Sequence, residues 1–254
     1  EMCIRDRDGN SPQAIAATAK AQLLAYPTVQ WLEASAISAS KTQAGFQVNT
    51  EQQSYQAKRL LLATGVTDQL PEIPGLAERW GKSIFHCPYC HGYELDQGPI
   101  GVLAASPLAL HHALMLPDWG ATTLFTNECF EPDAEQKAQL LARGVAIEPG
   151  KVLQISGKAD VQLTTGKTLQ MAGLFTQPGT TVNSPLAQQL GCQFEQGPMG
   201  AFIQTSASKE TTIAGVFACG DNARMAGSVA IAIGDGSLAG AMAHQSLLFG
   251  TISH

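Results

Sequence analysis

Pro99-Ile100-Gly101-Val102-Leu103 is a short apolar run with the composition of a buried strand. A helical pattern follows it from Leu108 to Leu116, and the stretch from Thr122 to Phe125 has the pattern of a second strand. Strand, helix and strand in this order form the start of a βαβ unit, whose two strands pair in parallel. The middle of the chain is therefore predicted to be an α/β unit.

Two further apolar strands flank this unit along the chain. Leu60-Leu61-Leu62-Ala63 is predicted to be a buried strand that leads into Thr64-Gly65. Gly215-Val216-Phe217-Ala218 runs in the same way into Cys219-Gly220-Asp221, and a long helix of small residues is predicted to start around Ser228. We therefore expect an α/β fold of two nucleotide-binding, Rossmann-like domains of three layers each, the second inserted in the first.

The expected domains have boundaries at residues 1–69, 70–180 and 181–254, with the inserted domain in the middle. In the first part, Ser11 and Pro12 have the pattern of a helix start, and the apolar spacing after them is that of an amphipathic helix. Alternating residues from Phe46 to Asn49 and around Tyr55 indicate a hairpin. In the second part, another helix is expected from Glu135 to Arg143.

The first six residues, Glu1-Met2-Cys3-Ile4-Arg5-Asp6, look like the translation of a transposon adapter used to build sequencing libraries. We exclude them from the fold argument. The first domain is accordingly expected to be truncated at its N-terminus, and Met2 is not expected to be the natural start.

Composition and charge exclude several classes of partner. The 254 residues are 44% apolar and carry a net charge of -6, without a dense Lys or Arg run. Nucleic acids and anionic membranes both select clustered positive charge, so neither is expected as a partner. The apolar stretch from Met225 to Ala243 is interrupted by Asp235 and several glycines, so it falls short of a membrane span. A soluble protein is expected.

Cys87-Pro88-Tyr89-Cys90 is the motif most directly linked to chemistry, because two thiols at this spacing can close a small disulfide ring. The remaining cysteines, once Cys3 is set aside, are each isolated: Cys129, Cys192 and Cys219. This pattern favours a redox-active pair in a reducing cytoplasm. Two alternatives stay open, a zinc site, which would need a second ligand pair, and c-type haem attachment, whose Cys-x-x-Cys-His string ends here at His91.

Three polar residues lie close to the cysteines. His91 follows Cys90 directly, and an imidazole with a pKa near 6.5 can take up and return a proton during thiol–disulfide exchange. A solvated loop histidine is the alternative. His86 and Glu94 are weaker candidates for the same role.

The segment after the strand at 215–218 has features of a cofactor site. Gly220-Asp221 can place a carboxylate against a ribose or ribitol hydroxyl. Ala226-Gly227-Ser228-Val229 can start a helix whose N–H groups point at an electron-rich acceptor such as a flavin carbonyl. An ordinary turn and helix cap would have the same pattern.

Three motifs together resemble a known family. Leu62-Ala63-Thr64-Gly65, then Cys-x-x-Cys, then Gly215-Val216-Phe217-Ala218-Cys219-Gly220-Asp221 occur in the order seen in low-molecular-weight thioredoxin reductases, and the resemblance covers nearly all of residues 7–254. It implies an FAD-dependent enzyme that passes electron pairs between flavin, the two cysteines and an external small-molecule or protein dithiol or disulfide, usually as a homodimer.

The resemblance also implies residue roles. Thr64 and Gly65 would line the FAD, Gly220 and Asp221 would bind its ribitol region, and Ser228-Val229 would face the isoalloxazine. Cys90 would be the flavin-proximal thiol and Cys87 the thiol that meets substrate. The Gly-x-Gly-x-x-Gly that holds the FAD pyrophosphate in the family is absent, and we expect roughly sixty upstream residues to supply it.

The cysteine segment and the nicotinamide loop both depart from thioredoxin reductases proper. Cys87-Pro88-Tyr89-Cys90-His91-Gly92-Tyr93-Glu94 is most similar to the branch that includes dithiol oxidases of disulfide natural products, with His91 where reductases carry a proton-donating Asp. Ala104 and Ser106 replace glycines of the nicotinamide loop, Pro107 removes an N–H donor, and Glu128 stands where NADPH enzymes carry basic residues. Use of NAD(P)H and the direction of electron flow are left open.

One alternative belongs to a different functional class. An inserted domain that had lost cofactor binding could use the two cysteines as a redox sensor or a metal clip in a non-catalytic module. Flavin absorbance distinguishes this alternative from an FAD-dependent enzyme.

Overall fold

The computed structural model describes residues 7, 9–225 and 227–250. The adapter-like residues 1–6 and Ala226 therefore lie outside the described residues. The described chain divides into two compact units, a middle unit of residues 68–179 and an outer unit made of the segments on either side. The chain passes between the units through β5 (Val66–Gln69) and β14 (Gly179–Val182), which pair in a two-stranded sheet.

The middle unit is built on a five-stranded parallel sheet, and it confirms the predicted βαβ start. β7 (Gln97–Leu103), α3 (Ala109–Met115) and β8 (Gly120–Phe125) follow each other, and β7 pairs with β8 in parallel. The strand order is β6-β13-β7-β8-β9, completed by β6 (Ile84–Phe85), β13 (Gly173–Thr176) and β9 (Ala146–Glu148). The order reverses between β7 and β13, and ligands of such sheets bind at the carboxyl ends of the strands near this reversal.

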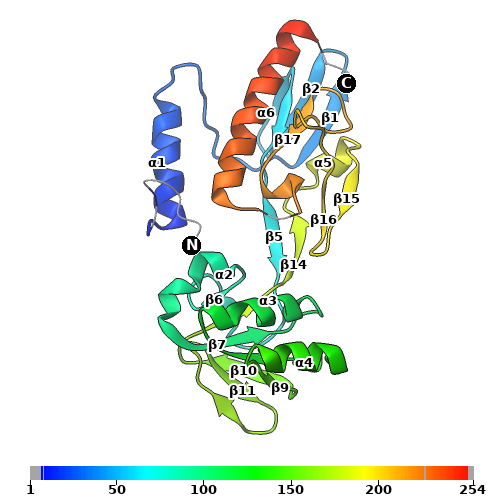
Figure 1. The fold of residues 1–254 in the computed structure, drawn as a ribbon. Helices are drawn as coiled ribbons and strands as arrows, with labels where there is room; N and C mark the ends of the chain where they lie inside the picture. The colour runs from blue at the N-terminus through cyan, green and yellow to red at the C-terminus, as the bar shows by residue number, and fades with distance from the viewer. Residues whose placement is uncertain (1–6, 8, 226, 251–254) are drawn as a thin grey trace. The chain divides into compact units, whose positions relative to one another are not determined.

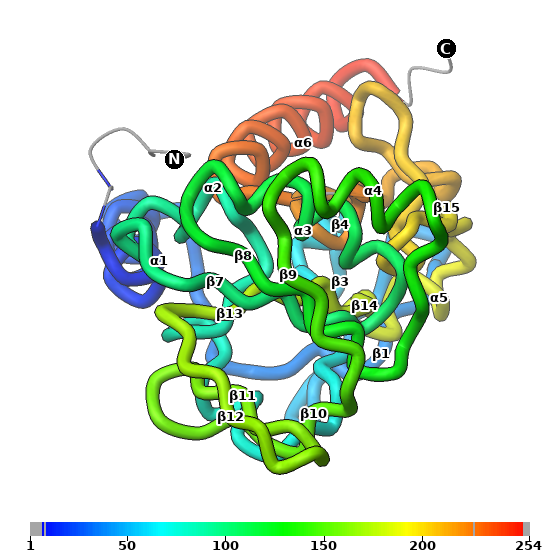
Figure 2. Tube along the Cα trace, turned by 60° about the horizontal axis from the view of Figure 1, so that its bottom comes forward, coloured from blue at the N-terminus to red at the C-terminus, as the bar shows by residue number. Residues whose placement is uncertain are grey.

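The middle unit has three layers (Figures 1 and 2). α3 and α4 (Ala134–Ala142) lie over one face of the parallel sheet. The antiparallel strands β10 (Val152–Ser156), β11 (Asp160–Leu163) and β12 (Thr168–Leu169) lie over the other. Each interface has its own apolar core, one around Val102, Ala113 and Phe175, the other around Leu103, Phe125 and Val161. This packing fixes the carboxyl ends of the strands.

The outer unit brings together segments from both ends of the chain. β4 (Leu60–Leu62) pairs in parallel with β17 (Val216–Ala218), more than 150 residues later. The hairpin prediction is confirmed by β1 (Ser38–Thr42), β2 (Gly45–Asn49) and β3 (Ser54–Ala57), which form an antiparallel sheet. The remaining elements are α5 (Leu186–Gln189), β15 (Phe194–Gln196), β16 (Ala201–Ile203) and the long α6 (Val229–Phe249).

Two predicted packing patterns differ from the structure. α1 (Pro12–Leu24) has the predicted cap, with Ser11 Oγ accepting from Ala14 N at 3.2 Å, but none of its described side chains is buried. Its apolar residues are spread around the helix and do not gather on one face, so the expectation of an amphipathic helix was wrong. In β4 only Leu62 is buried, while Leu61 is 41% exposed, so the expectation of a wholly buried strand was wrong.

No helix in the described part of the chain is both long enough and apolar enough to cross a membrane.

Candidate active site

The cysteine pair lies on a short helix at the start of the middle unit. α2 (Pro88–His91) follows β6, and Cys87 is its N-cap residue with an extended backbone. Pro88 suits the first helical position because its φ is already helical and its missing N–H is not needed there. This turn brings the two Sγ atoms to 2.6 Å from each other, with both side chains half-buried. The geometry therefore places the two thiols in direct contact.

The protonation of the pair is set by its surroundings. Burial raises the pKa of the Cys90 thiol to about 12, and the hydrogen bond with Cys87 acts in the same direction. A raised pKa means that the free dithiol holds the Cys90 proton at neutral pH, so deprotonation needs a proton acceptor nearby.

His91 lies beside the pair and is suited to accept a proton. Its ring stacks on Phe85 of β6, with centroids 4.1 Å apart and an interplanar angle of 21°. Burial lowers the pKa of His91 below 6.5; neighbouring His86 adds to this effect and Glu94 opposes it. The imidazole is therefore largely neutral at pH 7, the form that a general base requires.

A second group of predicted residues gathers at the carboxyl ends of β4 and β17. The parallel pairing of Ala218 with Leu62 brings Thr64 and Gly65 to the same edge as Gly220 and Asp221. Gly65 has a φ of +66° and open space where a side chain would stand. The carboxyl end of parallel strands is where α/β folds bind nucleotides, so these predicted residues share the edge at which a nucleotide is expected.

Asn222 is a residue of this edge that sequence reasoning missed. It lies in the 3-10 turn Asp221–Ala223, is fully buried, and its Nδ2 donates to Leu62 O at 3.0 Å and to Thr64 Oγ1 at 3.1 Å. Its Oδ1 is buried and has no hydrogen-bond partner within the described chain. Asn222 thus ties the two strand ends together across 160 residues. Its place directly after Gly220-Asp221 was the only signal in the sequence.

Asp221 and Ser228 are placed by the segment that leads into α6. A Cβ at Gly227 would lie 1.8 Å from Asp221 Oδ1, so the absence of a side chain there lets the carboxylate lie against the backbone. Ser228 Oγ accepts from Ile231 N at 3.3 Å, which confirms the predicted helix start at Ser228. The contacts of Ser228 and Val229 with a flavin stay a prediction.

An ion triad around the buried Asp235 links the same segment to α6. Asp235 is 4% exposed and accepts from Arg224 at 2.5 and 2.6 Å. Lys209 Nζ lies 2.9 Å from the same carboxylate. Hydrogen bonds from Arg224 hold the pKa of Asp235 well below its usual range. The triad was not predicted, because the three residues show no spacing pattern in the sequence.

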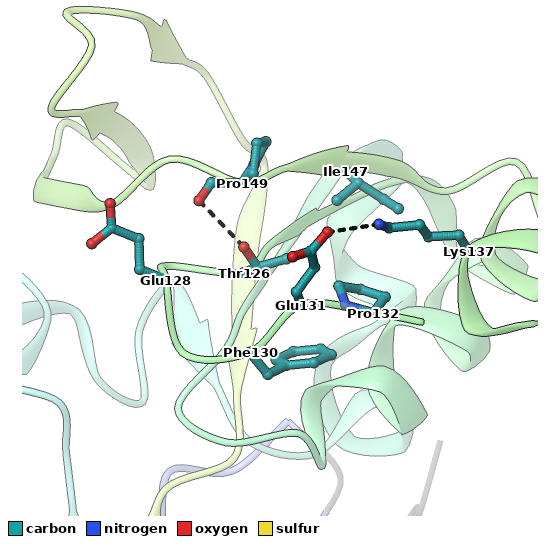
Figure 3. Close-up of a pocket in the computed structure, with 8 residues that line it drawn as sticks. All are labelled: Thr126, Glu128, Phe130, Glu131, Pro132, Lys137, Ile147 and Pro149. Carbon is teal, nitrogen blue, oxygen red and sulfur yellow. Dashed lines mark hydrogen bonds and ion pairs between the residues drawn. The ribbon is translucent and has the colours of Figure 1, made fainter. Parts of the chain in front are cut away.

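The carboxyl end of β8 borders a cavity of about 540 Å³ (Figure 3). Glu128 and Glu131 both line it, and Glu131 forms an ion pair with Lys137 at 2.9 Å. Its full lining comprises Thr126, Glu128, Phe130, Glu131, Pro132, Lys137, Ile147 and Pro149. This is the edge at which a nucleotide ribose would lie, and its charge is mainly acidic.

In the nicotinamide loop expected after β7, side chains and backbone groups are buried or bonded within the chain. Ala104 is fully buried, and its N–H donates to Phe125 O at 2.9 Å. Leu108 N donates to Ser106 Oγ at 3.3 Å, and α3 begins only at Ala109. The backbone donors of a phosphate-binding loop are therefore partly used within the chain.

Within the part of the chain that the structure describes, no three His, Cys, Asp or Glu side chains are grouped so as to hold a metal ion. The described chain thus offers the cysteine pair no third ligand of these types for a metal clip.

Comparisons with known proteins agree with this geometry. Residues 11–236 match the family model of pyridine nucleotide-disulphide oxidoreductases. A crystal structure of an oxidoreductase from Agrobacterium tumefaciens is 54% identical, with a TM-score of 0.94, over 98% of this chain and 85% of that one. Thioredoxin reductase tcpT of Claviceps purpurea is 34% identical over 95% of this chain and 79% of its own. Thioredoxin reductase aclD of Aspergillus oryzae is 31% identical over 77% of this chain and 66% of its own.

The match confirms the expected fold class and the expected class of enzyme. It spans the cysteine helix, the parallel strand ends and the first part of α6, which are the parts that the sequence had linked to flavin and thiol chemistry. The chain belongs to the pyridine nucleotide-disulphide oxidoreductase family, as an FAD-dependent enzyme that acts on thiols and disulfides.

Proposed function

We propose that Cys87 and Cys90 are the redox-active pair of this enzyme and that Cys87 is the thiol that meets substrate. The observation that carries the proposal is the 2.6 Å approach of the two sulfur atoms on α2. In the oxidising direction, a substrate thiolate attacks Cys87 Sγ of the disulfide, and Cys90 leaves as a thiolate. A second substrate thiolate then releases Cys87, so the substrate loses two electrons and the cysteine pair gains them. FAD, when bound, accepts that electron pair.

The roles of the cofactor residues are part of the same proposal. Thr64, Gly65, Gly220 and Asp221 hold FAD at the open edge of β4 and β17, while Ser228 and Val229 at the start of α6 face the isoalloxazine. Support comes from the shared strand edge and from the buried Asn222 Oδ1, which lacks a partner in the described chain. A buried acceptor without a partner is costly, and a bound group or water can supply the missing donor.

The substrate is proposed to be a small-molecule or protein dithiol or disulfide, handled in the cytoplasm by a homodimer. The isolated positions of Cys129, Cys192 and Cys219 favour a reducing compartment with one working pair. Exposed apolar side chains on α6, among them Ile233 and Leu248, support an interface with a second copy. The net charge of -6 supports the proposal that nucleic acid is no partner.

NADPH is expected to reduce this enzyme poorly. Ala104 is fully buried and its N–H already donates to Phe125 O, so it offers no donor to a pyrophosphate, and Pro107 has no N–H to offer. Glu128, one of the residues that line the cavity beside β8, would repel a 2′-phosphate. Each lost bond to a charged group costs about 1.5–3 kcal/mol, so two such losses weaken binding by roughly a hundredfold or more.

Anaerobic stopped-flow reduction of the bound flavin by NADPH, NADH and a dithiol measures this preference and tests the proposed function. We expect rapid reduction by the dithiol and slow reduction by micromolar NADPH. The double variant Ala104→Gly, Ser106→Gly combined with Glu128→Arg should improve the NADPH rate, since it restores the loop and reverses the charge. Rapid, saturable reduction of the unmodified enzyme by micromolar NADPH would show that the loop is functional as it stands. A purified FAD-loaded enzyme that no dithiol or disulfide oxidises or reduces would contradict the proposed function.

His91→Ala is expected to slow thiol–disulfide exchange by about a hundredfold or more near pH 7–8, because the neutral imidazole takes the thiol proton. The pKa of His91 lies below 6.5, so its contribution as a base is present above that pKa and is lost as the pH falls through it. The two rate profiles should therefore converge toward pH 5. Stopped-flow exchange with a dithiol between pH 5 and 9 gives both profiles, with His244→Ala on α6 as the matched control. A constant ratio across the pH range would assign His91 a structural role.

A further inference from the structure

The cysteine helix α2 is held by aromatic side chains from two separate parts of the middle unit. On one side the His91 ring stacks on Phe85, a core residue of β6. On the other side Tyr89, which lies between the two cysteines, meets Trp119 edge-to-face, with ring centroids 5.5 Å apart and an angle of 86°. Such pairs contribute beyond their buried area because the positive edge of one ring faces the negative face of the other. Trp119 is thus linked to the cysteine pair across about 30 residues.

Trp119 itself is firmly anchored. It follows the 3-10 helix Leu116–Asp118, and its backbone N–H donates to Leu116 O at 2.9 Å. Its ring packs against the core that includes residues of α3. Arg143 fastens the same turn, with an ion pair to Asp118 at 2.7 Å and a hydrogen bond to Leu114 O at 3.1 Å. The indole is therefore a fixed surface against which α2 can rest.

Gly92, the residue after α2, makes a second contact with the same ring. A Cβ at Gly92 would lie 2.8 Å from both Cδ1 and Cγ of Trp119 and 2.7 Å from Pro88 O, so no side chain fits there. The backbone of the turn thus lies directly on the indole. Trp119 contacts the cysteine helix at two points, one between the cysteines and one just after them.

We propose that Trp119 is a positioning residue for the redox pair, acting through Tyr89 and Gly92. It fixes α2 so that the two sulfur atoms stay in contact, which raises the effective concentration of one thiol toward the other. This inference rests on the proposed redox role of Cys87 and Cys90. Loosening the helix lowers that effective concentration, so the disulfide forms less readily from the dithiol.

The test measures the disulfide equilibrium of the pair without relying on turnover. The full chain is equilibrated in glutathione redox buffers, in which one glutathione disulfide oxidises the Cys87/Cys90 dithiol and yields two glutathione thiols. Free thiols are then trapped by alkylation and counted by mass spectrometry. In Trp119→Ala the equilibrium constant for disulfide formation should fall about tenfold, equivalent to roughly 30 mV. Trp119→Phe should stay within about twofold of the unmodified protein, because a phenyl ring can still pair with Tyr89.

Trp80→Ala is the matched control, because Trp80 is also half-buried in the middle unit but packs against the other core, on the β10–β12 side. It should leave the equilibrium unchanged. Gly92→Ala perturbs the same contact from the opposite side and should also weaken the disulfide. It can therefore test the proposal if Trp119→Ala fails to fold. An unchanged constant in Trp119→Ala or Gly92→Ala, or an equal fall in Trp80→Ala, would overturn the positioning role. An unmodified pair that stays reduced in every buffer would instead overturn the proposed function.

Discussion

Turnover of a dithiol substrate is expected to fall by at least about a thousandfold in both Cys87→Ser and Cys90→Ser. Each variant removes one of the two sulfur atoms that are 2.6 Å apart on α2, and a serine hydroxyl cannot form the disulfide through which we propose that electrons pass. The rest of the site, including His91 and the edge of β4 and β17, is left in place. Steady-state assays of the FAD-loaded enzyme measure the loss. Cys129→Ser, which removes an exposed cysteine, should retain full activity.

The two cysteine variants should nevertheless differ in their spectra. If Cys90 is the flavin-proximal thiol, its thiolate in Cys87→Ser gives long-wavelength charge-transfer absorbance with oxidised flavin, and Cys90→Ser does not. Burial raises the pKa of Cys90, so the band should grow as the pH is increased. Identical spectra for the two variants at every pH would reject the assignment of distinct roles.

Asp235→Asn is expected to lower the free energy of unfolding by about 3–5 kcal/mol. The change leaves Lys209 and the partly exposed Arg224 beside each other without the buried carboxylate that pairs them. Removing the buried partner of an ion cluster is strongly destabilising. Urea unfolding followed by near-UV circular dichroism measures the effect. Glu131→Gln breaks the exposed pair with Lys137, which solvent screens, and should leave the free energy of unfolding nearly unchanged. A similar small loss in Asp235→Asn would show that the triad adds little to stability.

The destabilisation should depend on pH in a defined direction. Hydrogen bonds from Arg224 hold the pKa of Asp235 below 3.8, its value in an unfolded chain. A lowered pKa stabilises the fold fully at pH values above the unfolded pKa, and the contribution is lost as the pH falls toward the folded pKa. The difference between Asp235→Asn and the unmodified protein should therefore be constant from pH 7 to 5 and shrink below about pH 4. A difference that grows on acidification would contradict this assignment of charge.

Local signals in the sequence were strong enough to predict most elements of the fold. The β7-α3-β8 unit, the hairpin at 45–57 and the start of α6 at Ser228 follow from apolar periodicity, turn residues and capping, all of which act over a few residues. These signals could not predict which faces of the elements are buried by other segments of the chain. The apolar residues of α1 are spread around the helix, and whether any of them becomes buried depends on distant segments; none of its described side chains is buried.

Some features of the candidate site could likewise be predicted from the sequence alone. The Cys87-x-x-Cys90 spacing by itself determined that two thiols could meet, because four residues can form one helical turn. The adjacent His91 was a candidate base, and that role stays a prediction. The order of three motifs along the chain was sufficient to predict the family. Each motif alone occurs in many proteins, but the three together in this order are specific.

Only the tertiary structure decided how those residues are held and tuned. Asn222 joins Leu62 and Thr64 across about 160 residues, and Trp119 supports Tyr89 and Gly92 across about 30. The Lys209, Asp235 and Arg224 triad and the burial that raises the pKa of Cys90 are of the same kind. Hydrogen bonds, ion pairs and desolvation depend on distances in space, and parallel strands bring together segments that no sequence spacing relates. The sequence therefore determined which groups could react, and the packing of distant segments decided their geometry and their protonation.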